Sequence, residues 1–135
     1  MPRFILLTNH AGSAGAGPMS EWDPDDITAH LAYLRALNER LVDSGELVDM
    51  QALTGPDLAE VVTSGGPAGT TVTDGPYAAA GEVLAGYRMV DVACGERAIE
   101  IAAEVSAAPG PGGVPLRRPV EVRQVMGLPP GGQDL

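Results

Sequence analysis

The sequence predicts an α+β fold in which two helices cover one face of an antiparallel sheet. Three observations predict it: an unbroken apolar run near the start, two later segments with helical periodicity, and strand-like segments between and after them. The length of 135 residues suits a single domain with a modest core. We expect this domain to span residues 1–126, with a disordered tail over residues 127–135.

The first predicted strand covers residues 3–9, where residues 4–7 form an apolar run without alternation. Such a run is typical of a central strand covered on both faces. Small residues without periodicity follow over residues 10–19, and they predict a loop.

The first helix has clear start and stop signals. Asp23 suits the N-cap, Pro24 suits the first helical position, and the two aspartates that follow favour the positive end of the helix dipole. The pair Ser44 and Gly45 supplies a stop. Between these signals, apolar residues recur on one stripe at about 100° per residue. They are Ile27, Leu31, Leu34, Leu37 and Leu41.

The later elements complete a recognisable order. They are a strand over residues 46–53, a hairpin over residues 58–63 and 70–73, a strand over residues 84–92, a helix over residues 95–108 and a strand over residues 119–126. This is the β-α-β-β-α-β order of a ferredoxin-like unit with an extra hairpin. The second sheet face would stay bare although it carries apolar residues, so we expect a homodimer in which two such faces meet.

Composition argues against several classes of function. The net charge is −10, with eight arginines and no lysine, so direct binding of nucleic acid is not expected. Arg117 and Arg118 lie beside a proline-rich segment and are expected in a solvated loop. No window approaches the ~18 apolar residues of a membrane span, and the single Cys94 cannot form an internal disulfide, so we expect a cytoplasmic protein. Cys94 follows an apolar run and is expected to be buried.

Several segments resemble the DGPF branch of the YCII-related proteins. Residues 72–77 read Val-Thr-Asp-Gly-Pro-Tyr and are followed by Gly86-Tyr87 in a strand, which resembles that branch's signature. Residues 119–126 resemble its last strand, and residues 29–34 resemble the first helix of the wider group, with its histidine. The resemblance implies a dimeric ferredoxin-like α+β barrel. The chain departs from the pattern at residues 78–81, where alanines and a glycine replace polar residues.

His30 is the most interesting candidate for chemistry, because its helical angle places it inside the apolar stripe. Two interpretations are open: a core histidine bonded to a backbone carbonyl, or a general acid/base held by a carboxylate. The resemblance implies a partner aspartate, and Asp74 is the best candidate. An aspartate in an Asp-Gly-Pro turn also caps its own backbone, so a turn role for Asp74 stays open.

The remaining candidates rank below His30. Glu82 and Arg123 could supply a carboxylate and an anion-binding guanidinium, or form a solvated pair, and Tyr77 could contact a ligand or fill a core edge. His10 and His30 are too isolated for a metal site, and no nucleotide-binding motif occurs, so neither a metal nor a cofactor is expected.

Two functions follow from these residues. The first is binding of a small organic molecule near His30, with lyase- or isomerase-type acid/base chemistry. The alternative is a non-enzymatic accessory protein that contacts a sigma factor of the extracytoplasmic-function type. The resemblance and the acidic charge of the chain both point to this alternative.

Overall fold

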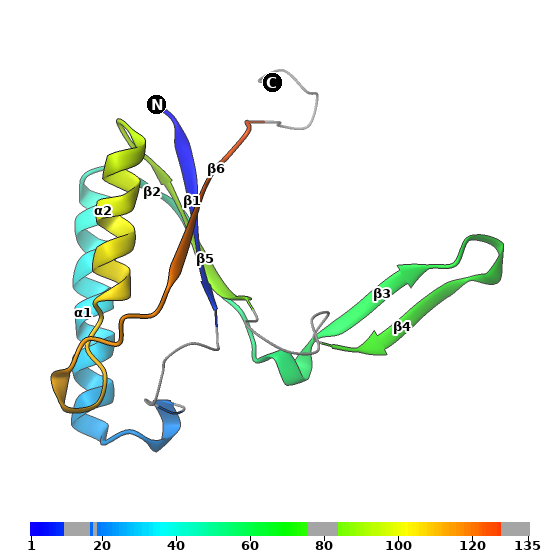
Figure 1. The fold of residues 1–135 in the computed structure, drawn as a ribbon, viewed down its shortest axis with the longest axis horizontal. Coiled ribbons are helices and arrows are strands. Elements are labelled where there is room, and N and C mark those ends of the chain that lie inside the picture. The colour runs from blue at the N-terminus through cyan, green and yellow to red at the C-terminus, as the bar shows by residue number, and fades with distance from the viewer. Residues whose placement is uncertain (10–16, 18, 76–83, 128–135) are drawn as a thin grey trace.

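The computed structural model describes residues 1–9, 17, 19–75 and 84–127, in which the longer elements are two helices and six strands (Figure 1). Residues 128–135 of the predicted tail over 127–135, and most of the predicted loop over residues 10–19, lie outside the described residues. The elements are β1 (Arg3–Asn9), α1 (Pro24–Asp43), β2 (Leu47–Ala52), β3 (Glu60–Ser64), β4 (Thr70–Asp74), β5 (Leu84–Asp91), α2 (Gly95–Ser106) and β6 (Val120–Gln124).

Helix α1 begins and ends where its sequence signals predict. The side chain of Asp23 accepts a hydrogen bond of 3.0 Å from the backbone N–H of Asp25, which satisfies one free donor at the helix start. At the other end, the backbone N–H of Glu46 donates to the carbonyl of Leu41. Gly45 between them has a φ of 78°, which glycine adopts without strain. The helix therefore closes with a Schellman motif.

Strands β1, β2, β5 and β6 form one antiparallel sheet in the order β2-β5-β1-β6. Strands β1 and β5 are central, and both helices lie on the same face of the sheet (Figure 1). Each helix thus connects two parallel strands that have one strand between them. This α+β arrangement is compatible with the predicted ferredoxin-like order.

The core lies between the helices and this sheet face. Its buried residues are Leu6, Leu37, Leu41, Val90, Val92, Ala98, Ile101, Ala102 and Val105. Two contacts tie the helices together: the Tyr33 hydroxyl donates to the carbonyl of Glu104 at 2.7 Å, and Arg40 pairs with the Glu104 carboxylate at 3.1 Å. Burial of the apolar side chains supplies most of the favourable free energy of such a core.

The opposite sheet face, which we call the open face, has no described helix on it (Figure 1). By strand register, the central side chains that point to this face are Ile5, Leu7, Tyr87 and Met89, and all are half-buried. The prediction that the first strand is central is confirmed. The helices cover only one of its faces, so its unbroken apolar run reflects a core face and an apolar open face.

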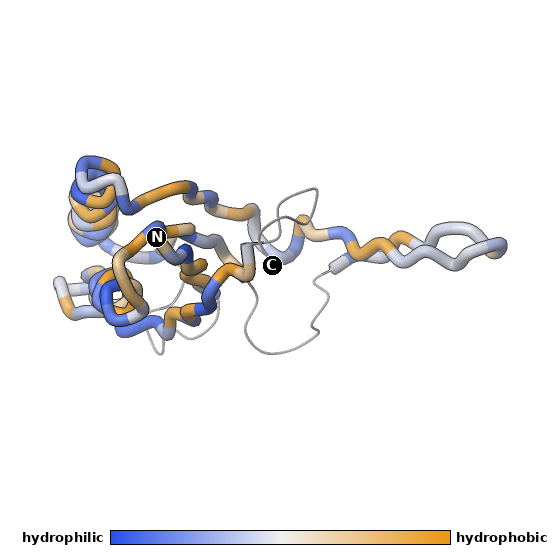
Figure 2. The backbone as a smooth tube through the Cα atoms, turned by 90° about the horizontal axis from the view of Figure 1, so that it is seen from above, coloured by the Kyte–Doolittle hydropathy of each residue, from blue (hydrophilic) through white to orange (hydrophobic). Residues whose placement is uncertain are grey.

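The predicted hairpin is present as β3 and β4, which pair only with each other among the described strands. It projects away from the helices along the longest axis of the molecule (Figures 1 and 2). Val62 and Val72 face each other across it and are 64% and 54% exposed. The hairpin therefore adds little to the core.

Two predictions about burial are wrong. Leu31 was expected on the buried stripe of α1 but is 46% exposed, because the inner line of the helix runs through His30, Leu37 and Leu41. Cys94 was expected to be buried but is exposed. The apolar run of β5 reaches the core up to Val92, and Cys94 lies beyond it, in the turn that precedes α2.

A bidentate ion pair joins Glu46, which lies just before β2, to Arg97 on α2. The Arg97 guanidinium donates to both oxygens of Glu46, at 2.8 and 2.9 Å. These hydrogen bonds hold the pKa of Glu46 below its ordinary value of 4.5. Because the pKa of Glu46 is lower in the folded state than in the unfolded state, the pair stabilises the fold fully at a pH above the unfolded-state pKa. Its contribution is lost as the pH falls through the folded-state pKa.

We expect Glu46→Gln to lower the free energy of unfolding by about 1 kcal/mol near neutral pH, since water screens this partly exposed pair. Denaturant melts at pH 7 and at about pH 3 would show that the difference shrinks at acid pH. Glu39→Gln is the control, because Glu39 is exposed on α1. A difference of the same size at both pH values would contradict the assigned role of the carboxylate.

Candidate functional site

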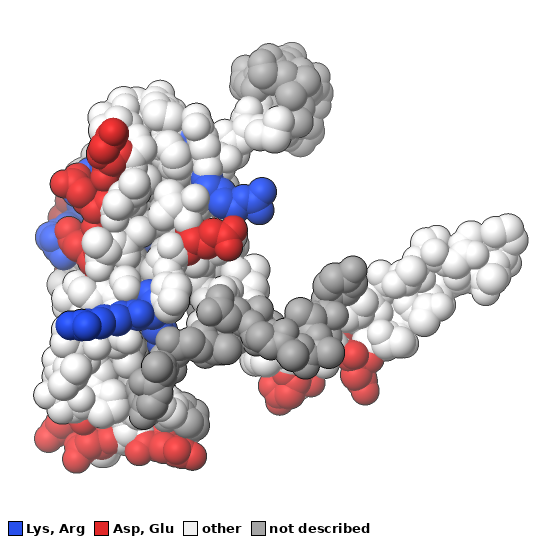
Figure 3. Space-filling view, in the orientation of Figure 1, with Lys and Arg blue, Asp and Glu red and all other residues white. Residues whose placement is uncertain are grey.

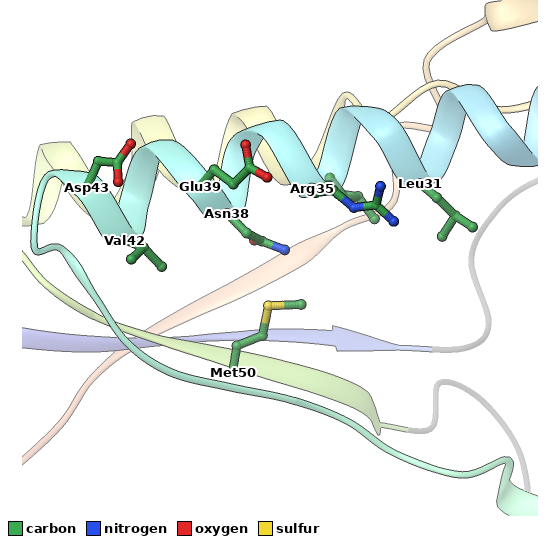
Figure 4. A pocket seen from close by; sticks show the side chains of 8 residues that line it. Leu31, Arg35, Asn38, Glu39, Val42, Asp43 and Met50 are labelled. Carbon is green, nitrogen blue, oxygen red and sulfur yellow. The ribbon is translucent and has the colours of Figure 1, made fainter.

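Three hollows in the described structure differ in chemistry. The largest, about 670 Å³, is an open groove between α1 and β2, where Met50 points from the strand toward the helix (Figure 4). A second groove, about 390 Å³, lies between α2 and β6 and has no titratable side chain. The smallest, about 110 Å³, is lined by His30, Arg88 and Arg118. We take this His30 cavity as the candidate site, because buried titratable groups converge there.

His30 lies in the second turn of α1 and is 7% exposed. Its Nδ1 is 3.0 Å from the carbonyl oxygen of Pro109. A carbonyl can only accept, so Nδ1 carries the proton and donates it. The ring of Trp22 packs edge-on against the imidazole, with the centroids 5.5 Å apart. These contacts fix the ring and leave Nε2 without a hydrogen bond to any described group.

Arg88 reaches the cavity from the middle of β5. It points to the helix-covered face and is 6% exposed, which is rare for a charged side chain. Its Nε donates to the side-chain oxygen of Asn38 at 3.1 Å. Burial lowers the pKa of the Arg88 guanidinium, since the charged form loses its hydration.

Arg118 reaches the same cavity from the segment before β6. Its Nε is buried and has no hydrogen-bond partner. Burial also lowers the pKa of this guanidinium. The preceding Arg117 has a φ of 56°, a left-handed conformation that costs a non-glycine residue of the order of 1 kcal/mol. The expected solvated loop is thus wrong for Arg118.

Two hydroxyl groups and several apolar side chains complete the cavity. Thr8 lies on β1, and its hydroxyl donates to the carbonyl of Gly86 at 3.2 Å. Ser106 ends α2. The apolar part of the lining consists of Leu34, Val105, Ala108, Leu116 and Val120. No acidic side chain lines the cavity, so its charge is positive in a chain whose net charge is −10.

The structure does not bring the other predicted site residues to His30. Asp74 ends β4 on the projecting hairpin, is exposed, and lies opposite Glu60. Arg123 pairs with Ile5 in the sheet and therefore points to the open face, where Glu121 is 4.0 Å away. Tyr77 and Glu82 lie outside the described residues. Among the predicted candidates that the structure describes, His30 alone lines the cavity.

Sequence reasoning missed both arginines of the cavity. The position of Arg88 could have been predicted from the sequence. Side chains alternate between the two faces of a strand, so Arg88 shares the core face with Val90 and Val92. Arg118 had no comparable signal. Its burial depends on how the segment after α2 folds back, with the Leu116 N–H bonded to the carbonyl of Ala108.

Fold and site together define an α+β protein with a small, positively charged, histidine-containing cavity. No family model matches the chain, and no curated protein matches it, so its resemblance to YCII-related proteins stays a prediction. Among the described residues, no helix has the length and apolar character needed to cross a bilayer. Those residues also contain no group of three or more His, Cys, Asp or Glu side chains placed to hold a metal.

Proposed function

We propose that the protein binds a small organic molecule in the His30 cavity. One observation carries the proposal: a buried histidine has one nitrogen fixed by the Pro109 carbonyl, and its other nitrogen bonds to no described group. The contact with the Pro109 carbonyl is one that a core histidine would also make, and the adjoining cavity with its two arginines is what favours a ligand. The cavity of about 110 Å³ is close to the size that holds a benzene-sized molecule, about 150 Å³.

The chemistry that His30 supports is transfer of one proton. As a neutral imidazole, Nε2 could accept a proton from a carbon next to a carbonyl group and return it to a neighbouring atom, which is isomerisation. Elimination would need a second group to protonate the leaving group. The described lining offers arginines and hydroxyls for that role and no carboxylic acid. The geometry therefore favours isomerase-type over lyase-type chemistry.

We also propose that the chain is a YCII-related protein of the DGPF branch. The support is the strand order β2-β5-β1-β6, with both helices on one face, and the position of the Asp74-Gly75 pair at the end of β4. His30 lies on the helix where the resemblance puts a histidine. The proposed pairing of His30 with Asp74 has no support within one chain, because Asp74 is exposed on the projecting hairpin and does not line the His30 cavity.

A homodimer through the open face is part of the proposal. Apolar side chains fill the centre of that face, and its charged groups nearly cancel: Arg3 and Arg123 oppose Asp49, Asp91 and Glu121, a sum of −1 in a chain of −10. Two copies of such a face can meet without strong repulsion, which favours a second copy as the occupant. Closure of two such sheets would form the α+β barrel.

The alternative partner, a sigma factor, has weaker support. Acidic side chains gather where α1 begins, at the lower end of the molecule in Figure 3. Asp23 caps the helix there, and Asp26 accepts a hydrogen bond from the N–H of Gly112. Helix capping and the helix dipole therefore explain these acids without a partner. A pull-down with a basic sigma factor that recovers this protein at stoichiometric levels would support the sigma factor as a partner.

The test is NMR of the two histidine rings during titration with small carbonyl compounds of roughly four to six non-hydrogen atoms, both neutral and charged. At least one compound is expected to shift the His30 signals in a saturable way and leave His10 unchanged. A His10→Asn variant assigns the signals, since the chain has two histidines.

His30→Asn is the matched variant, because an asparagine amide can still donate to the Pro109 carbonyl but lacks the atom that corresponds to Nε2. Ligand binding should weaken and any proton exchange with solvent should disappear in it, while the fold remains. Binding of equal strength in His30→Asn, or no response of His30 to any compound, would overturn the proposal.

A further inference from the structure

We propose that the His30 cavity binds the carboxylate group of a short-chain organic acid, with the guanidinium groups of Arg88 and Arg118 as its partners. The inference rests on the proposed function, because it names the class of ligand that the same cavity takes. Four features of the cavity carry it: a buried cation without an acidic partner, a buried donor without an acceptor, the net charge of the lining, and the cavity's size.

The first feature is the isolation of the Arg88 charge. In the described structure, the ion pairs made by arginines involve Arg3, Arg40, Arg97 and Arg123, and all four of these side chains are at least one-third exposed. Arg88 is far more buried but faces only the neutral oxygen of Asn38. A buried charge normally has a charged partner, because burial removes its hydration. An anionic ligand would supply that partner.

The second feature is the unused donor of Arg118. Its Nε is buried and makes no hydrogen bond, and each such group in a folded protein calls for an explanation. A guanidinium presents its N–H groups as a planar fork that matches the two oxygens of a carboxylate. The left-handed backbone at Arg117 holds this segment in a strained conformation, as is common at ligand sites.

The third feature is the charge balance of the lining. Two guanidinium groups contribute a charge of +2, and no lining residue is acidic. The C-terminal end of α2 lies at the cavity through Ser106, and a helix end carries only about half a negative charge. That partial charge cannot neutralise two arginines. A monoanion would offset one of them, and the helix end would offset part of the other.

The fourth feature is the size and shape of the remaining space. A volume of about 110 Å³ suits roughly four to six non-hydrogen atoms, so the acid must be short. Apolar side chains such as Leu34 and Val105 would contact its carbon chain, and the Ser106 hydroxyl could contact a second polar group. The carboxylate end would lie between the arginines, with the carbon chain within reach of the His30 ring.

The experiment compares propionate with propionamide, which have the same shape and differ in charge. Each is titrated into the full chain at constant ionic strength, with the His30 ring signals and the thermal midpoint as readouts. Inorganic phosphate is a third probe, because it shares the negative charge but has no carbon chain. Propionate is expected to bind at least about tenfold more tightly than propionamide and more tightly than phosphate.

Arg88→Met and Arg118→Met should each weaken propionate binding by about 10- to 100-fold, which is the usual effect of losing a charged hydrogen bond. Arg35→Met is the matched control, since Arg35 is exposed on α1 and does not line the His30 cavity, and it should bind propionate like the unaltered protein. Without ligand, Arg88→Met should melt at the same temperature or higher, because it removes a buried unpaired charge. This measurement confirms that the variant is folded.

Each other outcome has a definite meaning. Propionamide binding as tightly as propionate would overturn the inference but leave the proposed small-molecule function intact. Phosphate binding alone would also overturn it, because the cavity would then take inorganic anions. Unchanged propionate binding in both methionine variants would exclude the arginines as partners. No response to propionate would overturn the inference, and a response to another compound would still support the proposed function.

Discussion

Replacing Leu37 by alanine is expected to lower the free energy of unfolding by about 2–5 kcal/mol, the range for a fully buried leucine. Leu37 is 1% exposed and packs in the cluster between α1, α2 and the sheet. The substitution removes apolar contacts and leaves a cavity that the surrounding core fills only in part. Such a loss corresponds to a fall in Tm of the order of 10 °C for a domain of this size.

Leu31→Ala on the same helix is the control for this experiment. Both substitutions change the same atoms and the same helix propensity, but Leu31 is 46% exposed. Its effect should stay below about 1 kcal/mol. Melts must be run at one protein concentration, because association would shift the apparent stability. If both variants lose the same stability, the assignment of the inner face of α1 is wrong.

The second large effect is expected on the open face. Met89→Asp would place a carboxylate at the centre of the proposed dimer interface, between Ile5 on β1 and Asp49 on β2. Each dimer would bury two such charges, each opposite Asp49 in its own sheet, at a cost of several kcal/mol. The dissociation constant should therefore rise by at least about 1000-fold, since every 1.4 kcal/mol is a factor of ten.

Light scattering after size-exclusion chromatography measures this change directly. The mass of the unaltered protein should be twice 13.8 kDa, and that of Met89→Asp should be 13.8 kDa. Val62→Asp on the projecting hairpin is the control, because Val62 is 64% exposed and lies outside the open face. A monomeric unaltered protein, or a variant that stays dimeric, would refute the proposed interface.

The local elements could be predicted because their signals lie within a few residues of one another. The N-cap at Asp23 and the glycine at Gly45 mark the two ends of α1. The Gly65-Gly66-Pro67 turn connects the two strands of the hairpin. The burial of His30 also followed from helical geometry alone. In each case the free energy that selects the conformation comes from hydrogen bonds and packing along one element.

The site itself required the tertiary structure. Parity within β5 could have placed Arg88 in the core, but its place beside His30 depends on how α1 crosses the sheet. The sequence pattern predicts Asp74 as the partner of His30, but the structure places that aspartate on a separate hairpin. The side chains that share the cavity were Arg88 and Arg118, from β5 and from the segment that folds back after α2.

The sequence by itself thus determined the order of the elements, the ends of α1 and the inward direction of His30. Only the tertiary structure decided that two arginines converge on that histidine without an acid, and that Arg123 points to the opposite face. The physical reason is the separation along the chain over which each kind of interaction acts. Capping, turns and periodicity act between neighbours in the chain, whereas a cavity is formed by packing among elements that the chain separates widely.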